Sequence, residues 1–189
     1  MTLKEEIKHS VELLKKGKII LYPTDTIWGI GCDAKNTKAV QRIFKIKKRD
    51  DSKSMIVLLG STDELEKYIK NVPAIAFDLI ENSATPLTIV YSGAKKMSKK
   101  LIAKDGTIAI RVVKGRFTSE VIRQLGSPLV STSANISGQP TAATFDQIGD
   151  DIKNSVDYVV EHFRERTRNI RPSTIIRLME DGKFSIIRS

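Results

Sequence analysis

Short apolar runs alternate along this chain with segments of helical periodicity, and this alternation limits the fold more than any other feature of the sequence. Residues 19–22 form an apolar run that Pro23 stops, as expected for a buried strand that leads into a loop. Residues 3–16 precede it, and their apolar positions recur every three or four residues before Gly17, the pattern of an amphipathic helix. Strands that alternate with helices predict an α/β domain with a mostly parallel or mixed sheet.

The rest of the chain continues this pattern. We expect a loop over residues 23–33 and then a helix that begins at the N-cap Asn36 and ends at the basic cluster Lys47-Lys48-Arg49. Further strands are expected at residues 55–59, 87–91, 107–112, from 129 onward, 158–160, 173–178 and 184–188, and further helices at 62–69, 73–82 and 117–125. The length of 189 residues suits one buried core, so we expect a single domain over residues 1–189.

Charge and cysteine content narrow the class of partners. Lys and Arg outnumber Asp and Glu by 32 to 22, and the net charge of +10 favours polyanions such as nucleotides or RNA, although solvated surface lysines explain such an excess equally well. The sequence has neither a membrane-length apolar run nor a signal-peptide pattern, so we expect a cytoplasmic protein without a membrane partner. Cys32 is the single cysteine, and His9 and His162 lack zinc-ligand spacing, so neither a disulfide nor a structural metal is expected.

Nucleotide-binding motifs of the common kinds are missing. Residues 29–34 fit G-x-G-x-x-A superficially, but Pro23 and the polar residues after it interrupt the strand that a dinucleotide-binding loop requires. The sequence contains no G-x-x-x-x-G-K-[ST], so bound ATP would need another phosphate cradle. Each candidate cation, taken singly, is more often a surface charge. These candidates are Lys47, Arg49, Arg111 and Arg188.

The segment Ser133-Ala134-Asn135 offers a hydroxyl and an amide two residues apart. In an extended backbone these side chains point to the same side, where they would hold a phosphate or ribose oxygen together. An isolated S-x-N more often satisfies only the hydrogen bonds of a turn. The pair therefore gains weight only in combination with the basic cluster.

Three segments, in this order and spacing, resemble the threonylcarbamoyl-AMP synthase family, also called YrdC-like. They are YPTDTIWGIG at residues 22–31, KKR at 47–49 and STSANISG at 131–138. The resemblance covers essentially the whole chain and rests on the elements P-T-[DE]-T, K-x-R, A-[VI]-R and S-x-N. It implies a YrdC-like α/β fold, a twisted mixed parallel/antiparallel sheet flanked by helices with a concave basic cavity, in the short single-domain form.

The resemblance also implies an activity and its partners. Family members are nucleotidyltransferases that form threonylcarbamoyl-AMP and pyrophosphate from L-threonine, bicarbonate and ATP with Mg²⁺. They pass the product to a separate threonylcarbamoyl transferase complex, which modifies adenosine 37 of tRNA, and some members bind double-stranded RNA. Few carboxylates occur in the motifs, so Mg²⁺ is expected to arrive on the triphosphate and no residue is assigned to a protein-held metal.

Residue roles carry over by position in the motifs. The resemblance assigns a catalytic tetrad to Lys47, Arg49, Ser133 and Asn135. It assigns ATP contacts to Arg49, Lys53, Thr107, Ser133, Thr141 and Arg188, and threonine contacts to Thr26, Arg111, Ser131 and Ser173. Asp25 is the one acidic residue within a motif, and we expect it to orient its loop through hydrogen bonds to nearby backbone N–H groups.

Some positions depart from the family, and two other functions stay open. Leu58 stands where longer relatives have a threonine-contacting histidine, Asp50 replaces a proline, and residues 164–171 are arginine-rich where a glycine-containing loop is common. One alternative is an RNA-binding module without adenylating activity, although no aromatic strand of the kind used to stack bases is present. The other is a paralogue with another carbamoyl-related substrate.

Overall fold

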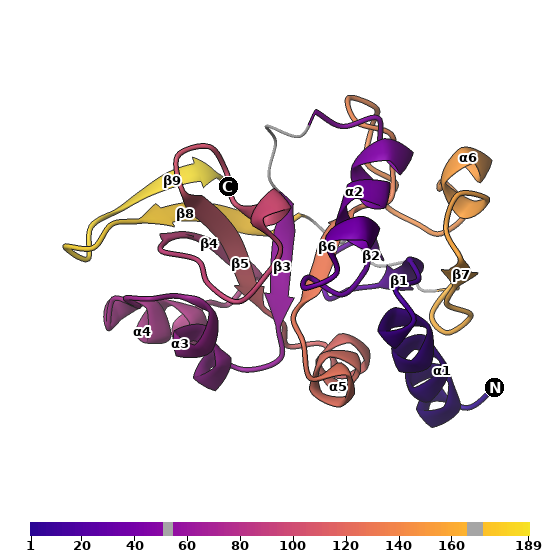
Figure 1. Cartoon of the computed structure of the whole chain (residues 1–189), viewed down its shortest axis with the longest axis horizontal. Helices are drawn as coiled ribbons and strands as arrows, with labels where there is room; N and C mark the ends of the chain where they lie inside the picture. Colours follow the sequence, from indigo (N-terminus) through magenta and orange to yellow (C-terminus); the bar gives the residue numbers. More distant parts are fainter. Residues whose placement is uncertain (51–54, 166–171) are drawn as a thin grey trace.

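Nine strands form one mixed sheet in a computed structural model that describes residues 1–50, 55–165 and 172–189 (Figure 1). The order across the sheet is β7-β1-β2-β6-β3-β5-β4-β8-β9. The strands are β1 (Ile20–Pro23), β2 (Trp28–Gly31), β3 (Ile56–Leu59), β4 (Leu87–Ser92), β5 (Thr107–Val112), β6 (Leu129–Ser133), β7 (Tyr158–Val159), β8 (Thr174–Leu178) and β9 (Phe184–Arg188). Parallel pairs join β1 to β7, β3 to β5 and β4 to β8, and the remaining neighbours are antiparallel. The predicted mixed α/β sheet is confirmed.

Helices surround this sheet (Figure 1). They are α1 (Leu3–Lys15), α2 (Thr37–Ile46), α3 (Leu65–Tyr68), α4 (Ile75–Asn82), α5 (Arg116–Leu125) and α6 (Asp150–Lys153), with 3-10 turns at Thr62–Glu64 and Lys99–Leu101. Thr2 caps α1 in a capping box with Glu5, and Asn36 caps α2 by accepting from the Ala39 N–H at 3.0 Å. Both helices turn their predicted apolar faces into the core. In the described part of the chain, no helix is long and apolar enough to cross a membrane.

Strand β2 lies where the sequence predicts only a loop, so the prediction for residues 28–31 is wrong. Trp28 and Ile30 are 5% and 0% exposed, as in any buried strand. Gly31 gives no strand signal in the sequence, because glycine is rare in strands. It is required by close approach, since a Cβ at Gly31 would lie 2.4 Å from the carbonyl oxygen of Val130 on β6. The expected helix over residues 62–69 is instead a 3-10 turn followed by the short helix α3.

Candidate active site

Most predicted site residues converge on one cavity of about 560 Å³, here named the basic cavity. Its lining includes nine of them: Thr26, Arg49, Thr107, Arg111, Ser131, Ser133, Thr141, Ser173 and Arg188. Lys104 and Arg177 also line it, and sequence reasoning assigned neither to the site. Among the described lining residues, five side chains are thus cationic and one, that of Asp105, is a carboxylate. A cavity with this balance of charge suits an anionic ligand.

A Schellman cap at the end of α2 presents the basic cluster. The Arg49 N–H donates to the Phe44 carbonyl oxygen at 3.0 Å, and the Lys48 N–H donates to that of Lys45 at 3.1 Å. Lys48 occupies the left-handed region with φ 48°, a place where glycine is more usual. The cap fixes the backbone of Arg49 at the cavity wall, where burial lowers the pKa of its guanidinium.

The side chain of Lys47 binds the backbone of the S-x-N segment. Its Nζ donates to the backbone oxygen of Ser133, to that of Asn135 at 2.6 Å and to Asn135 Oδ1 at 3.4 Å. Lys47 is 1% exposed, and burial together with the charge of Arg49 lowers its pKa to about 8. The Ser137 N–H donates to the Lys47 carbonyl oxygen at 2.8 Å. Lys47 therefore positions the loop that carries Ser133, and it does not line the basic cavity.

Asn135, predicted as a member of the catalytic tetrad, does not line the basic cavity. Strand β6 ends at Ser133, and the Asn135 N–H donates back to the Ser133 carbonyl oxygen at 2.9 Å, so the extended alternation does not reach Asn135. Its side-chain Nδ2 donates to the Gln139 carbonyl oxygen at 2.6 Å. Ser133 lines the cavity while Asn135 braces the loop. Lys53 lies outside the described residues.

The β1–β2 loop presents Thr26 as a hydrogen-bond acceptor. The Thr24 hydroxyl donates its one hydrogen to the Ile27 carbonyl oxygen at 2.6 Å. Thr26 Oγ1 lies 2.9 Å from Thr24 Oγ1, so Thr26 must be the donor in this contact. The remaining lone pairs of Thr26 are then available to an ammonium or hydroxyl group of a ligand. Thr24, a cavity residue that sequence reasoning did not assign, belongs to the same P-T-D-T motif.

Arg188, the last residue of β9, also lines the basic cavity. Its Nη2 and Nε donate to the Ser173 carbonyl oxygen at 2.8 and 3.3 Å. Burial and the nearby charge of Arg111 lower the pKa of Arg188. The Ser173 hydroxyl lies 2.7 Å from that of Thr88, a fully buried residue of β4. Two neighbouring guanidinium groups are stabilised when an anion binds between them.

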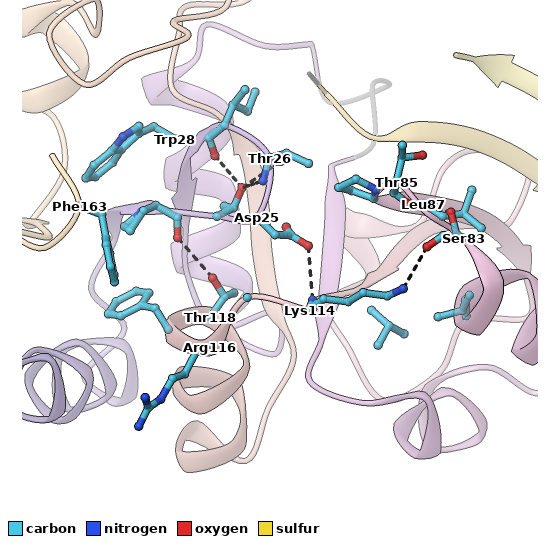
Figure 2. A pocket seen from close by; sticks show the side chains of 18 of the residues that line it. Asp25, Thr26, Trp28, Ser83, Thr85, Leu87, Lys114, Arg116, Thr118 and Phe163 are labelled. Atoms are coloured by element: carbon cyan, nitrogen blue, oxygen red, sulfur yellow. Dashed lines mark hydrogen bonds between the residues drawn. The ribbon is translucent and has the colours of Figure 1, made fainter. Parts of the chain in front are cut away.

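A second cavity of about 570 Å³ adjoins the β1–β2 loop (Figure 2). Both cavities are lined by Thr24, Thr26, Ile27 and Trp28, so this loop forms a shared wall. The second cavity has a mixed polar and apolar lining that includes Phe117 and Phe163. Figure 2 shows Lys114 extended between Asp25 and Ser83, while Arg116 points away from them.

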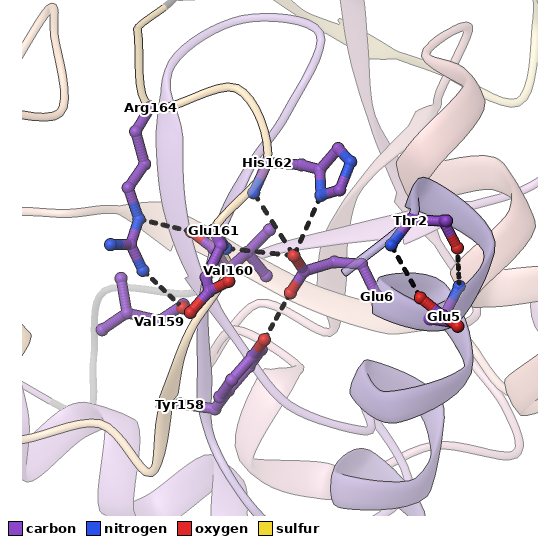
Figure 3. A network of polar contacts seen from close by, with 9 residues as sticks. All are labelled: Thr2, Glu5, Glu6, Tyr158, Val159, Val160, Glu161, His162 and Arg164. Carbon is purple, nitrogen blue, oxygen red and sulfur yellow. Dashed lines mark hydrogen bonds and ion pairs between the residues drawn. The ribbon is translucent and has the colours of Figure 1, made fainter.

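The buried carboxylate of Glu6 joins α1 to β7 and to the residues that follow it (Figure 3). Glu6 accepts hydrogen bonds from the Tyr158 hydroxyl, from His162 Nδ1 at 3.1 Å, and from the backbone N–H groups of Glu161 and His162 at 3.2 and 3.3 Å. Burial alone would raise the pKa of Glu6, but these donors lower it below its ordinary value. The network stabilises the wall of the second cavity away from the predicted site.

Metal-binding side chains are sparse. Within residues 1–50, 55–165 and 172–189, no group of three or more His, Cys, Asp or Glu residues is placed to hold a metal ion. Asp105, the one carboxylate lining the basic cavity there, already accepts from the Thr107 hydroxyl at 2.6 Å and pairs with Arg177 at 2.9 Å.

The mixed sheet in this strand order and the basic cavity define an α/β protein with a cavity whose charge suits small anionic ligands. The family model Sua5_yciO_yrdC, described as telomere recombination, matches residues 12–189. A threonylcarbamoyl-AMP synthase of Pseudoalteromonas translucida is 33% identical over 187 residues, which cover 97% of this chain and 99% of the relative. A putative threonylcarbamoyl-AMP synthase of Methanocaldococcus jannaschii is 37% identical over 188 residues, covering 96% and 86%. The chain belongs to the Sua5/YciO/YrdC family.

Solved structures share the fold. The P. abyssi Sua5 structure in complex with L-threonine has a TM-score of 0.83 and 27% identity, covering 91% of this chain and 50% of that one. The E. coli YciO structure has a TM-score of 0.84 and 27% identity, covering 100% and 90%. The present chain therefore spans about 90% of the YciO chain and about half of the Sua5 chain.

Proposed function

We propose that this protein is an L-threonylcarbamoyladenylate synthase, which converts L-threonine, bicarbonate and ATP into threonylcarbamoyl-AMP and pyrophosphate. The observation that carries the proposal is the convergence of nine predicted site residues, from segments far apart in sequence, on one basic cavity. Relatives of the same length carry this name, and a structural relative was solved with L-threonine. The product would serve a separate transferase complex that modifies tRNA.

The reaction needs positioning and charge stabilisation more than a strong base. The threonine amine forms a bond to the carbon of bicarbonate, whose C–OH bond breaks to release water, and the resulting carbamate forms a bond through its oxygen to the α-phosphorus of ATP. The bond from that phosphorus to the β-phosphate bridging oxygen breaks, and pyrophosphate leaves. Both reactants are anionic, so cations and hydrogen-bond donors that hold them in line lower the barrier.

The described residues divide between the two substrates. Arg111 would bind the threonine carboxylate, and the Thr26 lone pairs would accept from the substrate hydroxyl or amine. Arg49, Ser133 and Arg188 would hold the phosphates from the opposite walls. Mg²⁺ would be held mainly by phosphate oxygens and water, because the single cavity carboxylate among the described residues already has two partners. Bound there, Mg²⁺ would neutralise charge on the leaving pyrophosphate.

The test is pyrophosphate release by pure protein with ATP, Mg²⁺, bicarbonate and one amino acid at a time. We expect release with L-threonine and little with L-valine, which lacks the hydroxyl group. Arg49→Ala should slow release by about 10²-fold, the effect of losing one charge-stabilising donor. Lys45→Ala is the matched control, since Lys45 is an exposed cation four residues away that does not line the cavity. Release that ignores the amino acid would contradict the proposal.

A further inference from the structure

Asp25 and Arg111 form a buried ion pair at the basic cavity. Asp25 Oδ1 lies 3.0 Å from Arg111 Nη2, and the two side chains are 13% and 4% exposed. Asp25 belongs to the β1–β2 loop and Arg111 to β5, while β2, β6 and β3 separate β1 from β5 in the sheet. Asp25 itself lines the second cavity, and its neighbours Thr24 and Thr26 line the basic cavity with Arg111. The pair thus joins the β1–β2 loop to β5, which no sheet hydrogen bond connects directly.

The carboxylate of Asp25 is itself fixed from the side of the second cavity. Its Oδ2 accepts from the backbone N–H of Lys114 at 3.4 Å, a contact that is drawn in Figure 2. The backbone of Gly115 also packs against Asp25, since a Cβ at Gly115 would lie 3.5 Å from the Asp25 Cβ. Each carboxylate oxygen therefore contacts a different segment, and this restricts rotation of the side chain.

Arg111 has further N–H donors besides the one that contacts Asp25. A guanidinium has five N–H donors in a rigid fork, and Asp25 contacts it through Nη2. The Nε of Arg111 is buried and has no hydrogen-bond partner among the described residues. Arg111 lines the basic cavity together with Thr26 and Ser131. A carboxylate that enters there would meet the guanidinium, whose planar fork favours carboxylates.

We infer that Asp25 is a positioning residue for the amino-acid substrate: it holds Arg111 so that the free N–H groups of the guanidinium meet the substrate carboxylate. The inference rests on the proposed function and names a residue to which no ligand contact was assigned. Without the Asp25 charge, the guanidinium would lose its fixed orientation. Loss of this charge should weaken binding of the amino acid but not of the nucleotide, because the predicted nucleotide contacts are made by other side chains.

Asp25→Asn keeps the shape of the side chain and removes its charge. We expect the KM for L-threonine to rise by about 10- to 100-fold, the scale of one charged hydrogen bond, and the KM for ATP to stay within about threefold. Asp33→Asn is the matched control. Asp33 accepts from Ser127 Oγ and from the Lys35 N–H, yet it lines neither cavity, so both KM values should stay unchanged.

A double-mutant cycle separates positioning through Arg111 from a general structural role. Arg111→Met should raise the KM for threonine, and adding Asp25→Asn should raise it no further. Additive effects, or equal rises in the KM for threonine and for ATP, would overturn the inference. If Asp25→Asn does not fold, Asp25→Glu takes its place: its extra methylene displaces the carboxylate from Arg111, so a rise in the KM for threonine without a rise in the KM for ATP is again expected. Wild-type protein without threonine-dependent turnover would overturn the proposed function, whereas unchanged KM values in an active Asp25→Asn enzyme would overturn this inference alone.

Discussion

The Nζ of Lys47 lies 2.6 Å from the backbone oxygen of Asn135, so this lysine connects the two signature pairs K-x-R and S-x-N. Lys47 itself does not line the basic cavity. Arg49 and Ser133 line the basic cavity, whereas Lys47 and Asn135 do not line it and contact each other. The four residues predicted as a catalytic tetrad thus divide into two that face the cavity and two that brace the loop.

Lys47→Ala should reduce threonine-dependent pyrophosphate release by about 10²-fold, because the S-x-N loop loses the ammonium that holds its carbonyl oxygens. Lys47→Arg should recover part of the rate, since a charged donor remains. Steady-state kinetics with both variants checks the prediction. A wild-type rate for Lys47→Ala would show that the loop needs no such support.

The pKa of Lys47 near 8 predicts a loss of activity in mild alkali. As the pH rises through about 8, the ammonium loses the proton that binds the loop, and kcat/KM should fall. Stability changes in the opposite sense. The pKa in the folded chain lies below the ordinary value of 10.5, so the unfolded chain binds more protons between these limits and the free energy of unfolding rises with pH there. Lys47→Arg should lack the alkaline fall in activity, and an identical pH profile in that variant would contradict the assignment.

Replacing Lys48 by glycine should stabilise the fold by about 0.5–1 kcal/mol, because its φ of 48° suits a residue without a Cβ. The matched control is Lys45→Gly, within α2, which should destabilise by about 1 kcal/mol. Urea unfolding of the two variants measures both values. Destabilisation of similar size in each would contradict the Schellman cap.

Glu6→Gln should lower the free energy of unfolding by about 2–4 kcal/mol, since a buried carboxylate with four donors is replaced by an amide with one acceptor oxygen. The pKa of Glu6 is lowered from 4.5, so its stabilising contribution is present above that pH and is lost as the pH falls through the folded value. Glu12→Gln, exposed on the same helix, is the control. Unfolding curves that lose the same stability in acid for wild type and Glu6→Gln would contradict the role of this carboxylate.

Most of the sheet was predictable because its strands are short apolar runs bounded by turn residues. β2 was missed since Gly29 and Gly31 carry no strand signal, and the close approach of β6 requires glycine at position 31. Nine of the residues that line the basic cavity could be named from motif resemblance, but Thr24, Lys104 and Arg177 and the orientation of the side chains could not. The turn from Ser133 back to Asn135 and the reach of Asp25 to Arg111 depend on contacts between segments far apart in the sequence.

The proposed reaction joins an N-carboxylated threonine to AMP within one basic cavity. The most direct measurement is mass spectrometry of the adenylate formed from ATP, L-threonine and ¹³C-bicarbonate by wild type and by Arg49→Ala. We predict an adenylate that contains both threonine and the labelled carbon, formed about 10²-fold more slowly by the variant. An adenylate without the label, or none with wild-type protein, would contradict the claim.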